Sequence, residues 1–296
     1  GRWGRGPLSN GDACTDCHAN AGRGTVPDVA GEPLRSAVVR LAQPDARGAL
    51  QPHPAYGAQL QHLGILGRVP GEGEAFVEWT TRTVRYPDGD TVELRAPIIR
   101  LRDLAHGPIG DDTRLALRIA PDLAGAGWLD AIPDDAILAA AAAPQPDGIR
   151  GRPNRVPDRA TGQRVIGRLG HKAAQPDVRQ QVLVALHEDL GITSRRFPEQ
   201  NCTPAQRACS VEPRPSQPEI DADSEDDLVF HVQHLAPPAH ATPRDPVERR
   251  GERLFADAGC AACHTPAWTI ATADDATRTI HPYTDLLLHD LGPGLA

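Results

Sequence analysis

Two short stretches of the chain repeat the pattern Cys-x-x-Cys-His, at residues 14–18 and 260–264. Cysteines three positions apart lie on one side of a single helical turn, where both sulfurs can form thioethers to the two vinyl groups of one haem. The histidine that follows is placed to bring its imidazole to the iron, and the pattern is the attachment signature of c-type haem. The residues predicted to hold two covalently bound haems c are Cys14, Cys17, His18, Cys260, Cys263 and His264.

Zinc binding and thiol redox chemistry are the alternatives for the same cysteines. A structural zinc site usually takes its second pair of ligands from within about twenty residues, whereas the two pairs here lie at opposite ends of the chain. A thioredoxin-like dithiol needs one such motif near a βαβ pattern, and it needs no histidine. Two motifs, each followed by a histidine, therefore favour haem over both alternatives.

The remaining two cysteines, Cys202 and Cys209, lie in a polar segment rich in proline and serine. We predict a structural disulfide between them, because a catalytic dithiol at this spacing has no neighbouring histidine to support it. Disulfides persist in the periplasm and not in a reducing cytosol, which agrees with the compartment where c-type haems are assembled. We expect an exported, periplasmic protein whose signal peptide is absent from this segment.

The function of each haem depends on the sixth ligand of its iron. A six-coordinate iron passes electrons, whereas an iron with an open sixth position can bind peroxide. The chain contains no methionine, so the Met/His ligation of high-potential cytochromes cannot be built from it. His281 and His289 are candidate distal ligands, and His289 with Asp290 is a candidate acid/base pair, since peroxide cleavage requires a proton to move between the two oxygens. Hydrogen-bonded structural histidines are the competing interpretation.

Composition narrows the classes of partner. The chain is 40% hydrophobic with a formal net charge of −8 and a mean hydropathy of −0.40, values typical of a soluble globular protein. Its longest purely apolar run, residues 136–143, is far too short for a membrane span. Basic residues form no stripe interleaved with aromatic ones, so nucleic-acid binding has no support. The expected partner is a redox protein or a small oxidant.

The elements that must position the two motifs are predicted to be mostly helical. Asp245 and Pro246 are start signals for a helix that runs into the second motif, and this helix resembles the N-terminal helix of a class I cytochrome c. Two β-rich runs, residues 75–85 and 91–95, flank a turn-forming segment and predict a hairpin. Further helices are predicted at residues 133–139, 176–190 and 223–235.

These elements predict a mainly α fold with two cytochrome-c-like haem regions and a β-hairpin-containing insertion in the first. A proline-rich linker at residues 236–243 marks the expected boundary. Residues 1–238 would form the first haem region, with its insertion and helical segments. Residues 239–296 would begin a second cytochrome-c-like domain, truncated here because its last helix is missing.

Several segments occur in the order typical of one bacterial family. They are residues 6–8, 14–24, 53–61, 148–155, 201–206, 259–266 and 281–292. Together they resemble the di-haem oxidoreductases, often labelled predicted thiol oxidoreductases and related at a distance to di-haem cytochrome c peroxidases. The resemblance spans nearly the whole chain, and it implies an exported redox protein with two haems c.

The motifs and this resemblance predict a di-haem oxidoreductase of peroxidase type, in which one haem relays electrons and the other activates peroxide. The alternative is a non-enzymatic di-haem electron-transfer cytochrome with both irons six-coordinate. A five-coordinate, high-spin haem would favour the enzyme, because only an open coordination position can bind peroxide.

Overall fold

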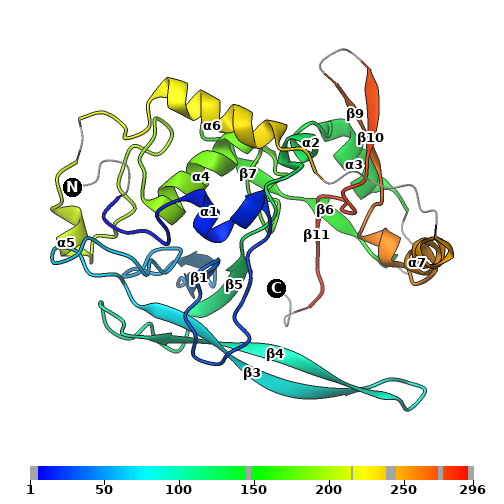
Figure 1. Cartoon of the computed structure of the whole chain (residues 1–296), viewed down its shortest axis with the longest axis horizontal. Coiled ribbons are helices and arrows are strands. Elements are labelled where there is room, and N and C mark those ends of the chain that lie inside the picture. Colours follow the sequence, from blue (N-terminus) through cyan, green and yellow to red (C-terminus); the bar gives the residue numbers. More distant parts are fainter. Residues whose placement is uncertain (1–5, 145–147, 215, 238–244, 273–275, 293–296) are drawn as a thin grey trace. The chain divides into compact units, whose positions relative to one another are not determined.

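A computed structural model describes residues 6–144, 148–214, 216–237, 245–272 and 276–292 (Figure 1). The structure is 25% helical and 26% strand, with several small antiparallel sheets. The prediction of a mainly α fold is therefore wrong. Local sequence signals identified the longer helices and the hairpin. Several of the remaining strands are only three residues long, too short for an alternating pattern to be recognised. Two strand pairs join segments that are distant in the sequence, residues 37–42 with 114–119 and residues 151–153 with 287–289, and no local pattern indicates such pairing.

The chain divides into two compact units. The first unit comprises Gly1–Asp122 and Leu183–Glu225, and the second comprises Leu123–Val182 and Asp226–Ala296. The first Cys-x-x-Cys-His motif belongs to the first unit and the second motif to the second unit. The predicted domain boundary after residue 238 lies outside the described residues and stays a prediction.

A three-stranded antiparallel sheet forms the centre of the first unit, with β1 between β2 and β5. The strands are β1 (Ala37–Pro44), β2 (Leu50–Pro52) and β5 (Arg114–Ile119). Every second residue at the start of β1 is buried, namely Ala37, Val39 and Leu41. This alternation is expected of a strand with one face on the core, and these residues pack with Leu34, Val77, Tyr56 and Leu60.

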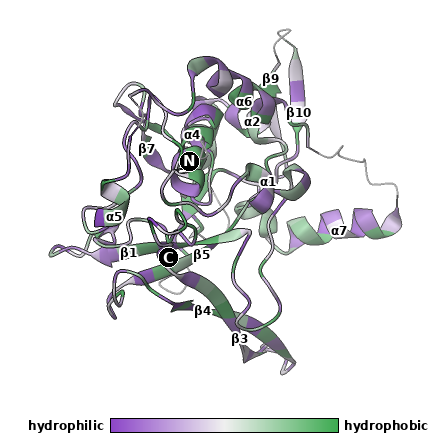
Figure 2. Ribbon diagram, turned by 60° about the vertical axis from the view of Figure 1, so that its left-hand side comes forward, coloured by the Kyte–Doolittle hydropathy of each residue, from purple (hydrophilic) through white to green (hydrophobic). Residues whose placement is uncertain are grey.

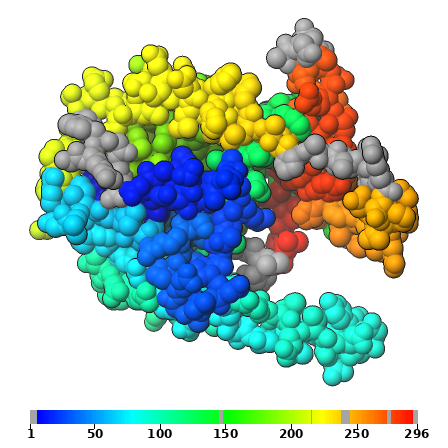
Figure 3. Space-filling view, in the orientation of Figure 1, coloured from blue at the N-terminus to red at the C-terminus, as the bar shows by residue number. Residues whose placement is uncertain are grey.

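A long hairpin joins this core and extends away from it (Figures 1 and 3). Its strands are β3 (Glu74–Arg85) and β4 (Thr91–Arg102), paired from Glu74 opposite Arg102 to Arg85 opposite Thr91. The predicted hairpin is confirmed, and β4 continues beyond the predicted run. The base of the hairpin is anchored, since Val77 is buried there. Farther out, Arg95 contacts Asp28 at 3.0 Å, and most residues of the outer half are exposed.

The helices follow local start and stop signals. The helices are α1 (Cys14–Cys17), α2 (Ala126–Asp130), α3 (Asp134–Ala142), α4 (Val178–Leu190), α5 (Arg207–Ser210), α6 (Ala222–His234) and α7 (Pro246–Asp257). The predicted helix before the second motif is confirmed, because the side chain of Asp245 accepts a hydrogen bond from the backbone N–H of Val247 and Pro246 occupies the first turn. Helix α4 ends at Leu190, and Gly191 follows it with a φ of 68°, a left-handed conformation that terminates many helices.

Hydrophobic and hydrophilic residues are interspersed along the helices, as the colours of α7 show in Figure 2. Among the described residues, none of the helices combines the length and the apolar character that a membrane crossing requires.

The second unit is built around short antiparallel strand pairs and a cluster of apolar side chains. The pairs are β6 (Gly151–Pro153) with β11 (Leu287–His289), β7 (Arg155–Pro157) with β8 (Arg164–Ile166), and β9 (Trp268–Ala271) with β10 (Thr277–Ile280). The buried side chains of the cluster are Ile132, Ile137, Ile166, Trp268, Ile270, Ile280 and Leu286. Trp268 and Ile270 contribute through alternate positions of β9, as a half-buried strand should.

Candidate functional site

The first motif forms a single helical turn. Helix α1 begins at Cys14, and the backbone N–H of His18 donates to the carbonyl of Cys14 at 2.8 Å. The Asp16 carboxylate accepts from the backbone N–H of Ala13 at 3.1 Å, which closes the N-terminal end of the turn. The local geometry thus places both cysteines on one turn with the histidine directly after them, as the motif predicts.

The thiols of this motif are held in their neutral form. Cys17 is half-buried, and its Sγ donates to the carbonyl of Arg35 at 3.4 Å. Desolvation, together with the nearby carboxylates of Asp189 and Asp16, raises the pKa of Cys17 to about 11. Desolvation also raises the pKa of Cys14. The thiolate is the reactive form of cysteine, so this environment disfavours dithiol exchange.

His18 has an unusual environment for a histidine. Its side chain is half-buried, and its Nδ1 is fully buried without a hydrogen-bond partner in the described part of the chain. A buried polar atom left unpaired costs free energy, so such atoms call for an explanation. Within the described residues, the ring of His18 therefore lacks the second contact that usually orients a metal-binding imidazole.

The second motif is more exposed. Gly259, at φ 76°, joins α7 to a single 3-10 turn at Cys260–Ala262. The backbone N–H of His264 donates to the carbonyl of Cys260 at 3.0 Å, so this histidine also follows directly after a turn that carries its cysteines. The two motifs therefore share a backbone arrangement but differ in burial.

A backbone carbonyl fixes the tautomer of His264. Its Nδ1 lies 3.0 Å from the carbonyl oxygen of Tyr283. A carbonyl only accepts, so Nδ1 must carry the hydrogen, which leaves the lone pair on Nε2. This second contact of the ring is the usual way in which a metal-binding histidine is oriented. Phe255 packs edge-on against Tyr283, with ring centroids 5.3 Å apart, and supports the same segment.

The segment that supplies this carbonyl is strained. Tyr283 and Leu286 have φ angles of 52° and 59°, which residues other than glycine seldom adopt. The carbonyl of Thr284, between them, accepts from the indole N–H of Trp268 at 2.8 Å. Such conformations cost about 1–3 kcal/mol each and persist only when the surroundings determine them. Here the buried Trp268 and the ring of His264 are the contacts that do so.

Asp285, buried in the middle of the strained segment, contacts His289. Its Oδ2 lies 2.7 Å from Nε2 of His289, and its Oδ1 accepts from the backbone N–H of Leu287 at 2.9 Å. Asp285 also lies near the second motif. The pKa of Cys263 is raised, mainly by burial and in addition by the negative charge of Asp285. A buried carboxylate that contacts an imidazole thus lies near Cys263.

A glycine makes room for this pair. Strand β6 places Gly151 opposite His289 on β11. A Cβ added at Gly151 would lie 2.8 Å from Cε1 of His289 and 2.7 Å from Cβ of Leu287, closer than real contacts allow. The imidazole of His289 therefore occupies space that only glycine leaves open. Its Nδ1 is buried and has no hydrogen-bond partner within the described ranges.

The sequence predicted a pair of His289 with Asp290, whereas the structure brings Asp285 to His289. Asp290, the predicted partner, is exposed and accepts from the backbone N–H of Gly292 at 3.0 Å. Asp285 was missed because a spacing of four residues indicates contact only in a helix, and this segment is a loop that enters a strand. His281, the other candidate distal ligand, directly follows β10 and is exposed.

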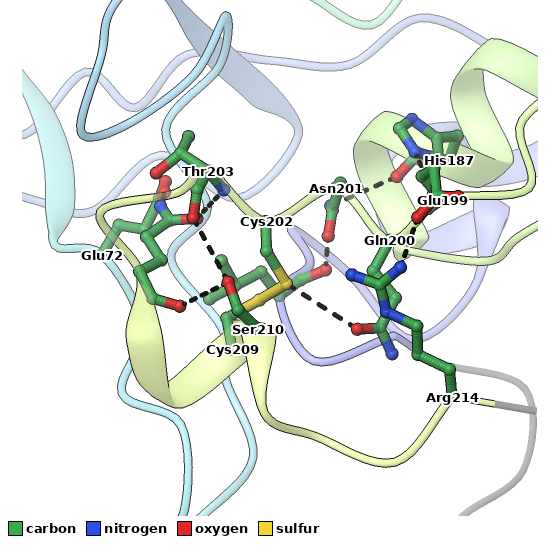
Figure 4. The surroundings of a disulfide bond; sticks show 12 residues. Glu72, His187, Glu199, Gln200, Asn201, Cys202, Thr203, Cys209, Ser210 and Arg214 are labelled. Carbon is green, nitrogen blue, oxygen red and sulfur yellow. Dashed lines mark hydrogen bonds and ion pairs between the residues drawn. A yellow bond between two sulfur atoms is a disulfide. The ribbon is translucent and has the colours of Figure 1, made fainter.

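Cys202 and Cys209 form a disulfide, with Cα atoms 5.8 Å apart (Figure 4). Cys209 is buried and packs with Leu8 and Val69. The bond closes a short loop of the first unit, and its cysteines are therefore not available as redox partners of the two motifs.

A buried glutamate fastens this loop to the rest of the first unit. Both oxygens of Glu72 accept hydrogen bonds, one from the side chain of Gln206 in the loop and one from the backbone N–H of Gln61. Gln206 in turn accepts from the backbone N–H of Thr203 at 2.7 Å. Burial raises the pKa of Glu72 to about 8 in spite of these bonds. The network is structural, since it connects three chain segments.

The donor set fits haem better than a bare metal ion. Across the described residues, no three His, Cys, Asp or Glu side chains converge as ligands of one ion, and this includes the two motifs. A structural zinc ion needs four such ligands. A haem iron already has the four ring nitrogens and needs one histidine, while the cysteines bond to the ring and not to the metal.

The chain matches the family model described as "Di-haem oxidoreductase, putative peroxidase" over residues 1–296. No curated protein and no solved structure matches it. The match covers both motifs and the segment 281–292 that carries Tyr283, Asp285 and His289.

Proposed function

Because the chain belongs to the di-haem oxidoreductase family, we propose that it binds two haems covalently and acts as a peroxidase-type oxidoreductase. This family is the one that the ordered segments of the sequence resemble, so that prediction is confirmed. The family name implies two haems. Their covalent attachment and the separate roles of the two irons are our proposal.

Each motif would hold one haem. Cys14 and Cys17 would form the thioethers of the first haem, and Cys260 and Cys263 those of the second. His18 and His264 would be the proximal ligands of the two irons. The observation that carries this assignment is the contact of 3.0 Å between Nδ1 of His264 and the carbonyl of Tyr283. It leaves Nε2 as the nitrogen with the lone pair, which an iron ligand requires.

The peroxidase role needs electrons and protons together. Reduction of hydrogen peroxide to two water molecules consumes two electrons and two protons. When bound, the two haems supply the one-electron steps, and a haem with an open coordination position supplies reactivity toward peroxide. An external redox protein would restore the electrons, and the chain must supply sites that hold protons.

His289 and Asp285 are the residues that we assign to hold a proton near the second motif. The carboxylate of Asp285 accepts at Nε2 of His289, so in the neutral ring Nδ1 is the basic nitrogen. A carboxylate in this position fixes the orientation of the ring and stabilises its protonated form. Nε2 is engaged by Asp285, which disfavours iron ligation through that atom and favours a proton-transfer role over the distal-ligand role.

We further propose a periplasmic location. The disulfide between Cys202 and Cys209 supports it, because such bonds persist in oxidising compartments. Covalent haem attachment by the two motifs would require the same compartment.

The first test is a haem count on the complete protein, expressed in the periplasm together with the c-type maturation machinery. A pyridine-haemochrome assay should give two haems c per polypeptide. The double variants Cys14→Ala/Cys17→Ala and Cys260→Ala/Cys263→Ala should each retain one haem. The matched control is Cys202→Ser/Cys209→Ser, which removes the same number of sulfurs and should keep both haems.

Absence of covalent haem from the wild-type protein would refute the proposal and return both motifs to thiol chemistry. With two haems present, the spin state and the reaction with peroxide decide the activity. A high-spin, five-coordinate haem that consumes peroxide supports the peroxidase. Two low-spin, six-coordinate haems without peroxide turnover would instead identify an electron-transfer cytochrome.

A further inference from the structure

The hairpin of β3 and β4 has two faces, and one of them contacts the core of the first unit. In paired strands, directly opposed residues share a face, and successive residues alternate between the faces. The hairpin residues that pack with the core all lie on one face, and they are Ala75, Val77, Trp79, Ile99 and Leu101. The opposite face, called the outward face below, therefore points away from this core.

Apolar side chains gather on the outer half of the outward face. Leu94 is 49% exposed and Ile98 is 37% exposed, and Val84, Val92 and Ala96 on the same face are half-buried. Toward the tip, the other face carries only polar side chains, namely Thr81, Thr83, Arg85, Thr91, Glu93 and Arg95. An antiparallel sheet with one face in water usually turns its polar residues to that face. The reversed arrangement is typical of a surface that binds another protein surface.

The free edge of β4 is less suited to such an interaction. Pro97 offers no backbone N–H to a further strand, and prolines in this position protect sheet edges from pairing. The hairpin extends away from the core of the first unit (Figures 1 and 3), and most residues of its outer half are exposed. A partner is therefore expected on the outward face and not along the edge.

The outward face is complementary to itself, because its residues are arranged symmetrically about a centre. They form layers, each made of two residues that lie opposite each other on β3 and β4. The central layer has small side chains, and each neighbouring layer combines one charged with one large apolar side chain. From tip to base, the layers are Val84 with Val92, Arg82 with Leu94, Thr80 with Ala96, and Glu78 with Ile98.

A twofold axis that crosses both strands at the central layer brings the two neighbouring layers together. Leu94 of one copy then lies over Ile98 of the other and Arg82 over Glu78, and each contact occurs twice. The Glu78 side chain is 46% exposed and contacts Arg100 at 2.8 Å, but a carboxylate can accept from more than one donor. An axis at the layer of Arg82 and Leu94 would instead place two arginines against each other. Charge complementarity therefore favours an axis at the central layer.

We propose that the outward face of the hairpin binds a second copy of this chain, face to face, about a twofold axis at Thr80 and Ala96. Two sheets pack about 10 Å apart, and the small central side chains permit this approach. The four layers cover an area of roughly 25 Å by 10 Å, from the spacing of residues and strands. Small interfaces belong to weak, reversible complexes, so the dimer is in equilibrium with the monomer. Dimerisation through this face requires neither haem nor peroxide chemistry.

Sedimentation equilibrium of the complete holoprotein, measured over a range of protein concentrations, tests the dimer. The wild-type protein should show a reversible equilibrium between monomer and dimer. Leu94→Ser should raise the dissociation constant about tenfold, because one substitution removes an apolar contact on each side of the axis. The matched control is Leu50→Ser, since Leu50 on β2 is 59% exposed and lies outside the hairpin. It should leave the dissociation constant unchanged.

An exchange of charges tests the position of the axis. Arg82→Glu and Glu78→Arg should each raise the dissociation constant about tenfold, since like charges then face each other. An equal mixture of the two variants should regain most of the lost affinity, because opposite charges meet at both contacts of the mixed dimer. Arg85→Glu is the control, because Arg85 is exposed on the same strand but belongs to the other face. It should dimerise like the wild-type protein.

Three results would overturn the proposal. The first is a wild-type protein that stays monomeric at every concentration. The second is a dimer whose dissociation constant is unchanged by Leu94→Ser, because its interface would then lie elsewhere. The third is a mixture of the two charge variants that dimerises no better than either variant alone, which would exclude the axis at Thr80 and Ala96.

Discussion

The two Cys-x-x-Cys-His motifs have the same local pattern but are positioned by different means. The first is desolvated by remote parts of its unit, including the carbonyl of Arg35 and the carboxylate of Asp189. The second is exposed, and its histidine is oriented by one nearby strained segment through the carbonyl of Tyr283. The same five-residue signature thus occurs in two different environments, and in each case the surrounding fold determines the environment.

If long-range contacts position the first motif, then disrupting the hydrogen bonds of Glu72 should destabilise the first unit and leave the second motif unaffected. The folded-state pKa of Glu72 is about 8, above its usual value of about 4.3. The folded chain therefore keeps a proton that the unfolded chain releases between these pH values. The contribution of protonated Glu72 to the free energy of unfolding is therefore fully present below about pH 4.3, and it is lost as the pH rises through about 8. This is the largest effect that we expect, on the order of a few kcal/mol.

The measurement is the free energy of unfolding as a function of pH, with a spectroscopic signal of the first unit. Glu72→Gln keeps the shape and cannot ionise, so the decline toward pH 8 should disappear. Glu93→Gln, at an exposed position of the outer hairpin, is the control and should keep the wild-type slope. An unchanged slope in Glu72→Gln would contradict the burial of a protonated Glu72.

If a local segment positions the second motif, then a methyl group at Gly151 should disturb it and leave the first motif intact. The added Cβ would press on His289 and Leu287 at less than 3 Å. Overpacking of this kind costs about 1–3 kcal/mol. Gly151→Ala should lower the melting temperature and alter the spectrum of the second haem only. Gly251→Ala is the control, because Gly251 in α7 also has no positive φ and a Cβ there would meet open space; equal losses in both variants would argue against the clash.

The smallest effect concerns the thiols, measured by alkylation against pH in the haem-free protein. Asp189 and Asp285 each raise the pKa of a cysteine, Cys17 and Cys263 respectively. Asp189→Asn should lower the pKa of Cys17 and leave that of Cys263 unchanged. Asp285→Asn should lower the pKa of Cys263 and leave that of Cys17 unchanged. A shift of both thiols in either variant would show that the two environments are not independent.

The sequence predicted the elements whose signals are local. Asp245 and Pro246 predicted α7, and the turn between the β-rich runs predicted the hairpin of β3 and β4. The prediction of a mainly α fold was wrong for two reasons. Many strands have only three residues, which is too short for an alternating pattern, and β1 pairs with β5, Ala37 opposite Ile119, although neither segment indicates so distant a partner. Such pairing depends on packing of the whole unit.

The candidate site shows the same limit. Cysteines and histidines are visible in the sequence, so both motifs could be recognised. The ring of His264 is oriented by a backbone carbonyl, and every residue has one, so its residue type carries no signal. Asp285 reaches His289 because Tyr283 and Leu286 adopt left-handed conformations, which their side chains do not favour.

The long hairpin has a practical consequence for counting the haems. Its exposed turn, with Arg85 and Tyr86 at the start, lies between the two motifs in the sequence. A protease that cuts after Arg85 would leave residues 1–85 and 86–296, each with one Cys-x-x-Cys-His motif. The strands on both sides of the cut remain paired in the native molecule. On a denaturing gel stained for haem, a covalent attachment at both motifs would then appear as two bands, one for each iron.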